Sequence, residues 1–244
     1  MTFQGKRYWL VGASEGLGLA LARQMHAKGA TVILSARNAA RLDEVCATLP
    51  NAQALPLDVA DSAAVTEAAA KIGPIDGVVW LAGVYTPMTA TALDPAAFVQ
   101  MCDVNFTGCA RVIGAALPGM VARNQGHIVL TGSLSGFRGL PGAMGYQASK
   151  SGVMALAECL YADLRGTGIR VQLANPGYIK TRLTDKNTFA MPFLMEPEEA
   201  AAQIMALMEG TAFKRSFPTM FSWLFRLSQF LPDWIYYRVF APLK

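Results

Sequence analysis

Three residues in the second half of the chain have the types and spacing that proton transfer at a carbonyl or alcohol group requires. Tyr146 and Lys150 stand four residues apart in Tyr-Gln-Ala-Ser-Lys, and Ser133 comes thirteen residues before the tyrosine. Positions i and i+4 share one face of a helix, so we expect the lysine ammonium beside the phenol oxygen. A neighbouring cation favours phenolate and lowers the tyrosine pKa from about 10 towards neutral pH, where the phenol can exchange a proton.

Ser133 follows a predicted strand at 127–131, whose carboxyl end would face the same crevice as the tyrosine. There the serine can donate a hydrogen bond to a substrate carbonyl oxygen. A Tyr-x-x-x-Lys pair alone is common on amphipathic helices, where the tyrosine packs and the lysine is solvated. The strand-end serine and a glycine-rich turn upstream favour the catalytic interpretation of the pair.

That glycine-rich turn lies between the first predicted strand and the first predicted helix, in the sequence Gly12-Ala-Ser-Glu-Gly16-Leu-Gly18. Glycines let the backbone approach a ligand closely, and a pyrophosphate can bind the free N–H groups and the positive end of the helix dipole. Such turns also occur between strands and helices for steric reasons alone. At the first strand-to-helix junction the pattern favours a dinucleotide site, by analogy with the related fingerprint.

The end of the second predicted strand indicates which dinucleotide binds. Sites for the unphosphorylated cofactor usually carry an acid there for the ribose 2′-hydroxyl, whereas this chain has Ser35-Ala36-Arg37. The guanidinium of Arg37 can pair with a 2′-phosphate, so NADP(H) is favoured and NAD(H) stays open. Glu15 in the glycine-rich turn argues the other way, because a base there would have helped. The alternative for Arg37 is a surface residue that caps a loop.

Short apolar runs alternate along the chain with longer segments of helical spacing, which is the pattern of strand-helix-strand units. Strands are predicted at 8–11, 31–36, 77–81, 127–131 and 170–174, and helices at 17–28, 38–49, 61–72, 95–120 and 146–165. Continuous apolar strands are expected where helices cover both faces of a sheet. The sequence therefore predicts a single α/β domain with a Rossmann-type, doubly wound parallel sheet.

With these motifs in this order, residues 5–210 resemble a classical short-chain dehydrogenase/reductase. The resemblance implies a catalytic tetrad of Asn105, Ser133, Tyr146 and Lys150, in which Asn105 fixes a water in a proton relay through the lysine. It implies a phosphate loop that contains Gly12, Ser14, Glu15, Gly16, Leu17 and Gly18. It further implies that the cofactor contacts Asp58, Val59, Ala82, Gly83, Tyr146, Lys150, Pro176, Gly177, Ile179 and Thr181.

One position departs from the family pattern. The family usually has Asn-Asn-Ala-Gly at the end of the fourth strand, and this chain has Trp80-Leu81-Ala82-Gly83. The asparagines mainly stabilise the sheet and do no chemistry. The catalytic assignment is therefore unaffected, but the hydrogen bonding around Trp80 is expected to differ.

Composition and charge exclude several classes of protein. The chain has 244 residues, of which 53% are hydrophobic and 16% charged, so it can bury a core and is not a disordered tail protein. The first 210 residues hold 16 basic and 16 acidic residues, without the basic clusters that nucleic-acid binding requires. Four cysteines without Cys-x-x-Cys spacing and two histidines argue against a metal site. We find no signal peptide and no apolar run of about 20 residues, and we expect a cytoplasmic protein that is at most peripheral to a membrane.

The last 34 residues, 211–244, differ from the domain at 1–210. They hold ten of the 23 aromatic residues and five basic residues against one acid, Asp233. A helix is predicted at 218–232, with a wide apolar arc and a narrow polar arc of Ser222, Arg226, Ser228 and Gln229. Three roles stay open for this extension: a lid over the substrate pocket, an oligomer interface, or membrane contact through 218–240.

These observations predict an NADP(H)-dependent oxidoreductase that interconverts a ketone or aldehyde with an alcohol on an apolar, lipid-like small molecule. A homodimer or homotetramer is expected. Two alternatives stay open: a cofactor-binding sensor or scaffold without catalysis, and a steroid or sugar dehydrogenase of the same family. The loops at 84–95 and 184–195 carry few polar groups, and such loops vary freely on a shared scaffold, so they do not identify the substrate.

Overall fold

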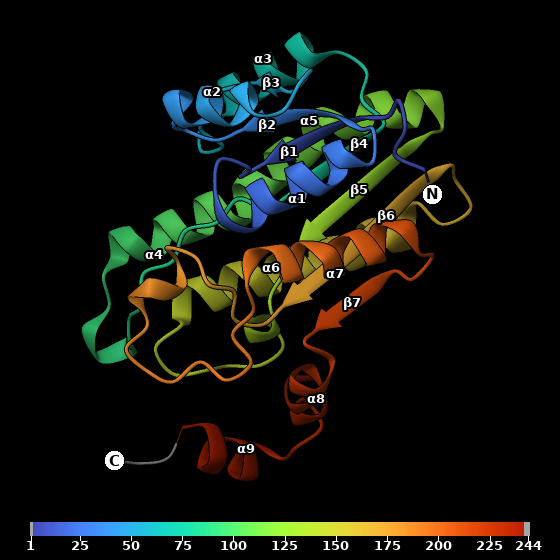
Figure 1. Cartoon of the computed structure of the whole chain (residues 1–244). Coiled ribbons are helices and arrows are strands. Elements are labelled where there is room, and N and C mark those ends of the chain that lie inside the picture. Colours follow the sequence, from blue (N-terminus) through green and yellow to red (C-terminus); the bar gives the residue numbers. More distant parts are fainter. Residues whose placement is uncertain (1, 242–244) are drawn as a thin grey trace.

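Residues 2–241, the part of the chain that the computed structural model describes, contain one sheet of seven parallel strands in the order β3-β2-β1-β4-β5-β6-β7 (Figure 1). The strands are β1 Arg7–Val11, β2 Thr31–Ser35, β3 Gln53–Ala54, β4 Gly77–Trp80, β5 Gly126–Thr131, β6 Ile169–Pro176 and β7 Lys214–Phe217. The order reverses between β1 and β4, and in such sheets a crevice opens there at the carboxyl ends of the strands. The predicted doubly wound α/β fold is confirmed.

Helices cover both faces of the sheet. One face carries α1 Gly16–Ala27, α2 Ala39–Ala47 and α7 Pro197–Glu209, and the other carries α3 Ser62–Ile72, α5 Gly108–Arg123 and α6 Met144–Asp163. Alternate strand residues supply the two cores: Leu10 packs with α1 and α7, whereas Trp9 and Val11 pack with α3, α5 and α6. Because both faces are covered, β4 and β5 are buried along their whole length, as we expected.

A continuous helical run precedes β5. In this run α4 Pro95–Cys102 passes through a π-helical turn, η2 Asp103–Thr107, into α5. By length and composition the run of 29 residues could cross a membrane, contrary to our expectation that no segment could. Cys109, Val112 and Met120 are buried in the second core, so the α5 part of the run packs on the sheet.

The chain remains in the sheet longer than we predicted. β7 pairs with β6, so the sheet continues into the segment that we assigned to the C-terminal extension. The strand gave no clear signal because Lys214 and Arg215 face solvent, as charged residues often do on edge strands. The sequence analysis also missed α7, which begins with a capping box between Glu196 and Glu199.

After β7 the chain leaves the sheet and forms two short helices, seen below it in Figure 1. These are α8 Thr219–Ser228, within the predicted helix at 218–232, and α9 Asp233–Phe240, which we did not predict. Phe221 and Phe225 of α8 pack on Leu134, in the 3₁₀ turn η3 Leu134–Gly136 that follows β5. The extension is therefore attached at the carboxyl edge of the sheet. Two further 3₁₀ turns, η1 Ala90–Ala92 and η4 Thr184–Lys186, lie in the loops after β4 and β6.

Candidate active site

Close backbone contacts shape the glycine-rich turn after β1. Gly12 has a φ of 95°, and a Cβ atom there would collide with the backbone of Ala82. A Cβ atom on Gly18 would collide with the carbonyl oxygen of Gly12. α1 begins at Gly16, and its N-cap residue Glu15 makes no side-chain capping hydrogen bond. The first N–H groups of α1 therefore have no side-chain acceptor, and this helix end suits an anion such as pyrophosphate.

The segment after β6 lies against this turn. Arg182 donates to Glu15 Oε1 from Nε at 2.7 Å and from Nη2 at 2.5 Å. A Cβ atom on Gly16 would lie 2.9 Å from Thr181 Cγ2, so Thr181 is near the glycine-rich turn, as its predicted cofactor role requires. Because Arg182 neutralises Glu15, the acid is a weaker obstacle to a phosphorylated cofactor than we inferred. Sequence reasoning missed this pairing, since the two residues are 167 positions apart.

The structure brings Ser133, Tyr146 and Lys150 together beside the end of β5. Ser133 Oγ accepts hydrogen bonds from Ser135 N at 3.2 Å and Ser135 Oγ at 2.9 Å, and the serine hydroxyl is close enough to Tyr146 to lower the pKa of the phenol. One turn further along α6, Lys150 Nζ lies 5.7 Å from the centroid of the Tyr146 ring and donates to Thr131 O at 3.0 Å. The predicted shared helix face is confirmed.

Burial changes the protonation of both titratable side chains. It raises the pKa of Tyr146 to about 12, although the nearby Ser133 hydroxyl acts to lower it. It also lowers the pKa of Lys150 to about 8. Our prediction that the tyrosine pKa is lowered was therefore wrong for the free chain, because the loss of solvent is the largest influence on the phenol. Near neutral pH Tyr146 holds its proton.

Asn105 lies in the π-helical turn η2, a type of irregularity that often marks functional sites. Its Oδ1 accepts from Val84 N at 2.7 Å, and its Nδ2 donates to Val84 O at 3.0 Å and to Ser149 Oγ at 2.9 Å. A Cβ atom on Gly83 would lie 3.6 Å from Asn105 Oδ1 and 3.8 Å from Lys150 Nζ. Asn105 thus fixes the loop after β4 next to the lysine, while its role in a water relay stays a prediction.

The residues expected at the adenosine end lie after β2 and β3. Arg37 is exposed and makes no ion pair with another described residue. Asp58 comes after β3, the strand next to β2. Just before it, Leu57 N donates to Ala36 O at 3.0 Å. The Asp58 carboxylate accepts from Ala60 N at 3.0 Å, and the Val59 side chain is buried against Gly108 of α5. Val59 is thus a packing residue as well as a predicted adenine contact.

The segment from Pro176 onward covers the carboxyl edge of the sheet. A Cβ atom on Gly177 would lie 3.3 Å from Leu134, Phe221 and Pro218, so the chain passes closely between η3 and α8. Ile179 forms an isolated bridge with Met195. Gly177 therefore lies beside η3, which follows Ser133, whereas the closing of Pro176, Gly177 and Ile179 over the nicotinamide stays a prediction.

Two tyrosines that sequence reasoning missed lie near Tyr146. The Tyr85 ring packs edge-on against Tyr146, with 5.2 Å between centroids, and Lys186 Nζ donates to Tyr85 O at 2.6 Å. Burial raises the pKa of Tyr85, and the nearby Tyr178 raises it further. Each tyrosine follows the end of a predicted strand by a few residues. That position was the available signal, because side chains there line the crevice.

Several buried polar atoms at this edge have no hydrogen-bond partner among the described residues. They include Trp80 Nε1, Thr131 Oγ1 and Asn175 Oδ1, at the ends of β4, β5 and β6. Trp80 stands where the chain departs from the family pattern, and a buried indole N–H without an acceptor costs about 1–3 kcal/mol. Within residues 2–241 we find no group of three or more His, Cys, Asp or Glu residues that could hold a metal ion.

Comparison with known proteins agrees with this geometry. A model of the short chain dehydrogenase family matches residues 6–191. The chain is 38% identical over 233 residues to an uncharacterized oxidoreductase of Myxococcus xanthus (strain DK1622), and the match covers 92% of each protein.

Solved structures have the same fold. A 3-oxoacyl-[acyl-carrier protein] reductase from Brucella melitensis ATCC 23457 is 27% identical, with a TM-score of 0.79 over 88% of this chain and 91% of that one. A short chain dehydrogenase from Burkholderia cenocepacia J2315, solved in complex with NADP, is 24% identical, with a TM-score of 0.88 over 99% of both chains. The second similarity shows that the fold, including the C-terminal segment, recurs in another protein.

Proposed function

The chain belongs to the short-chain dehydrogenase/reductase family, and from this premise we propose that it interconverts an apolar ketone or aldehyde with its alcohol, using NADP(H). It is an oxidoreductase acting on CH–OH groups, and its family binds nicotinamide cofactors. The observation that carries the proposal is the convergence of Ser133, Tyr146 and Lys150 beside the uncapped start of α1.

The protonation states of these groups suit carbonyl reduction. The bound cofactor supplies a hydride to the carbonyl carbon. Ser133 donates a hydrogen bond to the carbonyl oxygen, and Tyr146, which is protonated near neutral pH, gives its proton to that oxygen as negative charge develops. Lys150 would hold the ribose of the bound cofactor, and its charge would stabilise the phenolate that remains. In the oxidation direction Tyr146 takes the proton back from the alcohol.

The charge distribution around the adenosine end supports NADP(H) over NAD(H). Arg37 is exposed directly after β2 and is not engaged by an acid among the described residues. Glu15, the acid within the predicted phosphate loop, is paired with Arg182. A 2′-phosphate would therefore meet an available guanidinium and a neutralised carboxylate.

The surroundings of Tyr146 support an apolar substrate. Tyr85 and Tyr178 lie on one side of the site, and Phe189 contacts Tyr178 with 6.0 Å between ring centroids. Aromatic surfaces of this kind favour acyl or alkyl groups over the hydroxyl-rich surface of a sugar. The similarity to a 3-oxoacyl-[acyl-carrier protein] reductase makes a ketone on an acyl chain the first substrate class to test.

The test is a spectrophotometric assay of NADPH consumption by the full-length protein with a panel of ketones. The panel contains methyl ketones of increasing chain length, a 3-oxoacyl thioester, a steroid ketone and a ketose, each assayed with NADPH and with NADH. We expect turnover with the acyl or alkyl ketones and a preference for NADPH. Absence of turnover with every ketone and both cofactors would contradict the proposal and favour a non-catalytic cofactor-binding protein.

A further inference from the structure

The outward side of α8 is apolar. Met220, Trp223, Leu224 and Leu227 are 80%, 47%, 49% and 57% exposed. They recur at positions i, i+3, i+4 and i+7, so they form one stripe along the helix. On a helix that packs against its own domain such a stripe normally faces the core, whereas here it faces away from it.

Both serines of this helix face the protein instead. Ser222 and Ser228 are 1% and 3% exposed, and their hydroxyls donate to Thr219 O and Phe225 O, each at 2.8 Å. The polar arc that we predicted therefore includes two buried serines, because each serine satisfies its hydroxyl on its own helix backbone and can be buried. The apolar stripe is consequently left without a partner in the described chain.

α9 and the turn before it enlarge this apolar surface. Phe230, Trp234 and Val239 are 83%, 72% and 62% exposed, and Tyr237 is 48% exposed. Between the two helices lies an apolar hollow of about 380 Å³, lined by Trp223, Leu224, Leu227, Ser228, Leu231 and Phe240. Monomeric soluble proteins rarely expose continuous apolar surfaces of this kind unless the surface binds something.

The two helices are firmly attached to the catalytic domain. Arg138 donates to Ser228 O at 2.5 Å and Leu231 O at 2.7 Å, and its Nη2 forms an ion pair with Asp233 at 2.5 Å. Its guanidinium lies 4.0 Å from the centroid of the Tyr236 ring, whose hydroxyl donates to Gly139 O at 2.8 Å. These contacts attach α8 and α9 to the domain with their apolar surface facing outward.

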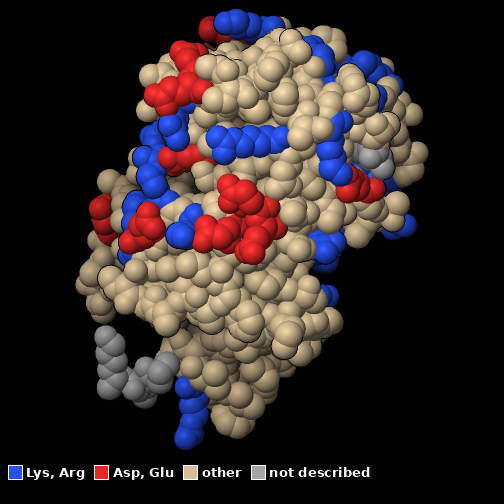
Figure 2. All heavy atoms as spheres, in the orientation of Figure 1, with Lys and Arg blue, Asp and Glu red and all other residues tan. Residues whose placement is uncertain are grey.

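The charges on this surface select the partner. The charged residues of 218–241 are Arg226, Asp233 and Arg238, and Asp233 is engaged by Arg138. Arg226 and Arg238 are exposed, and the Arg226 guanidinium lies 4.4 Å over the Trp223 ring. In Figure 2 the end of the molecule that carries α8 and α9 in Figure 1 is almost entirely tan, with basic side chains at its edge and no acidic side chain in this view. A second copy of this face would add arginines without free acids, whereas anionic lipid headgroups provide the opposite charge.

The apolar surface connects to the active site through aromatic side chains. Phe221, on the inner side of α8, lies 5.9 Å from Tyr178 and 5.4 Å from Phe193 between ring centroids. Tyr178 is close enough to Tyr85 to raise its pKa, and Tyr85 packs on Tyr146. An apolar path of side chains therefore leads from the outer helices to the catalytic tyrosine.

We propose that the outer surface of α8 and α9 docks on an anionic lipid bilayer and that the active site takes its carbonyl substrate from that bilayer. The helices have 10 and 8 residues, too few to cross a membrane, and would lie in its interface with Trp223, Trp234 and Tyr237 at headgroup depth. The access of substrate from the bilayer rests on the proposed function, but the docking itself does not.

The test uses the full-length protein and sedimentation with vesicles made of equal parts phosphatidylcholine and phosphatidylglycerol. The test variant combines Leu224→Glu and Leu227→Glu. The matched control combines Val99→Glu and Val121→Glu, whose side chains are 63% and 54% exposed on α4 and α5. We expect wild type and control to bind the vesicles. The affinity of the test variant should fall by about tenfold or more, because two apolar side chains no longer enter the bilayer.

Two kinetic assays separate this proposal from the proposed function. All three proteins should turn over a water-soluble ketone, ethyl acetoacetate, at the same rate, while the test variant should lose turnover of a long-chain methyl ketone held in the vesicles. Failure of wild type to bind these vesicles would overturn the docking proposal, as would equal loss of binding in the control. A dimer that the test variant converts to monomer, with vesicle binding unchanged, would assign the surface to a second copy. Absence of turnover with both ketones would contradict the proposed function and leave the binding result to stand alone.

Discussion

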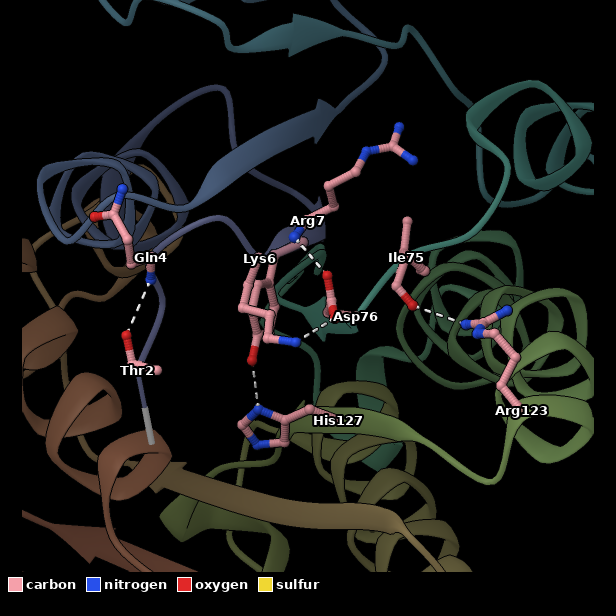
Figure 3. A network of polar contacts seen from close by, with 9 residues as sticks. Thr2, Gln4, Lys6, Arg7, Ile75, Asp76, Arg123 and His127 are labelled. Atoms are coloured by element: carbon pink, nitrogen blue, oxygen red, sulfur yellow. Dashed lines mark hydrogen bonds and ion pairs between the residues drawn. The ribbon is translucent and has the colours of Figure 1, made fainter.

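The amino ends and the carboxyl ends of the strands form two sides of the sheet, here the amino edge and the carboxyl edge. The two sides differ in how completely their buried polar groups are hydrogen-bonded. At the amino edge, shown in Figure 3, Asp76 accepts hydrogen bonds from Lys6 Nζ and from Arg7 N, both at 2.9 Å, and His127 lies nearby on β5. His127 Nδ1 is 2.9 Å from the hydroxyl of Tyr8, and its Nε2 is 2.9 Å from Gln172 Oε1. Burial lowers the pKa of His127 to about 3, so the ring is neutral and both nitrogens are bonded.

The carboxyl edge leaves polar groups with unused capacity. Thr131 Oγ1 and Asn175 Oδ1 have no partner among the described residues, and Lys150 is buried with its ammonium on a single described acceptor, Thr131 O. Buried polar groups therefore have two different roles in this fold. Where the chain satisfies its own polar groups they hold the sheet together, and where it does not they are available to a ligand.

The largest effect should come from removing the phenol at the carboxyl edge. Tyr146→Phe should lower kcat about 10³-fold, because the phenol is the group that we propose gives a proton to the carbonyl oxygen. Cofactor affinity and the free energy of unfolding should change little. Tyr161→Phe, at an exposed position of the same helix, is the matched control and should keep wild-type kcat. Wild-type turnover by the Tyr146→Phe protein would contradict the functional role that we assign to the polar groups at the carboxyl edge.

At the amino edge the same kind of deletion should cost stability and spare activity. Gln172 is fully buried and its Nε2 donates to the carbonyls of Leu207 and Ala212, each at 2.8 Å. Gln172→Leu removes a donor from both carbonyls and leaves His127 Nε2 without its partner, so urea unfolding should show a loss of about 3 kcal/mol. The kcat of the folded fraction should remain that of wild type. Gln100→Leu, at an exposed site on α4, should be neutral, and equal stability of the two variants would break the comparison.

A smaller effect should distinguish the two cofactors. Arg37→Ala should weaken NADPH binding about tenfold, because the 2′-phosphate loses its charge partner, and should leave NADH binding unchanged. Fluorescence titration with each cofactor measures both constants. Arg41→Ala, four residues further on and paired with Glu44 at 2.7 Å, is the control. Equal loss of affinity for NADPH and NADH would show that Arg37 does not read the 2′ position.

The smallest effect concerns Asp76. Burial alone would raise the pKa of this carboxyl, but hydrogen bonds from Arg7 and Lys6 and nearby positive charge lower it overall. A lowered pKa means that the carboxylate stabilises the fold above its usual pKa, and that this stabilisation is lost as the pH falls through the lowered value. Asp76→Asn should therefore cost less than about 1 kcal/mol at neutral pH, and the difference from wild type should shrink at acid pH. A difference that grows on acidification would contradict this reading.

The sequence was sufficient for features set by local chemistry. The spacing of Tyr146 and Lys150 predicted one helix face, and the strand ends correctly located Ser133 and the glycine-rich turn. Alternating apolar runs predicted the covered parallel sheet because burial on both faces leaves a direct imprint on composition.

Features set by distant contacts could not be predicted in this way. The raised pKa of Tyr146 depends on how completely the surrounding elements exclude water. The pairing of Glu15 with Arg182 joins two loops, and the inward position of Ser222 depends on what α8 packs against. We did not predict β7, because an edge strand with charged side chains lacks the apolar pattern of a covered strand.

The most direct test of the comparison is thermal unfolding of the cofactor-free Lys150→Met protein. Burial lowers the pKa of Lys150 to about 8 from a usual 10.5, so the wild-type fold carries a penalty below pH 8 that fades as the pH rises towards 10.5. At pH 7 the variant should be more stable than wild type by about 1–3 kcal/mol while losing NADPH turnover, since the charge serves chemistry at the expense of the fold. Lys71→Met, at an exposed site on α3, should change neither property. A Lys150→Met protein that melts at a lower temperature than wild type and still turns over ketones would contradict the account.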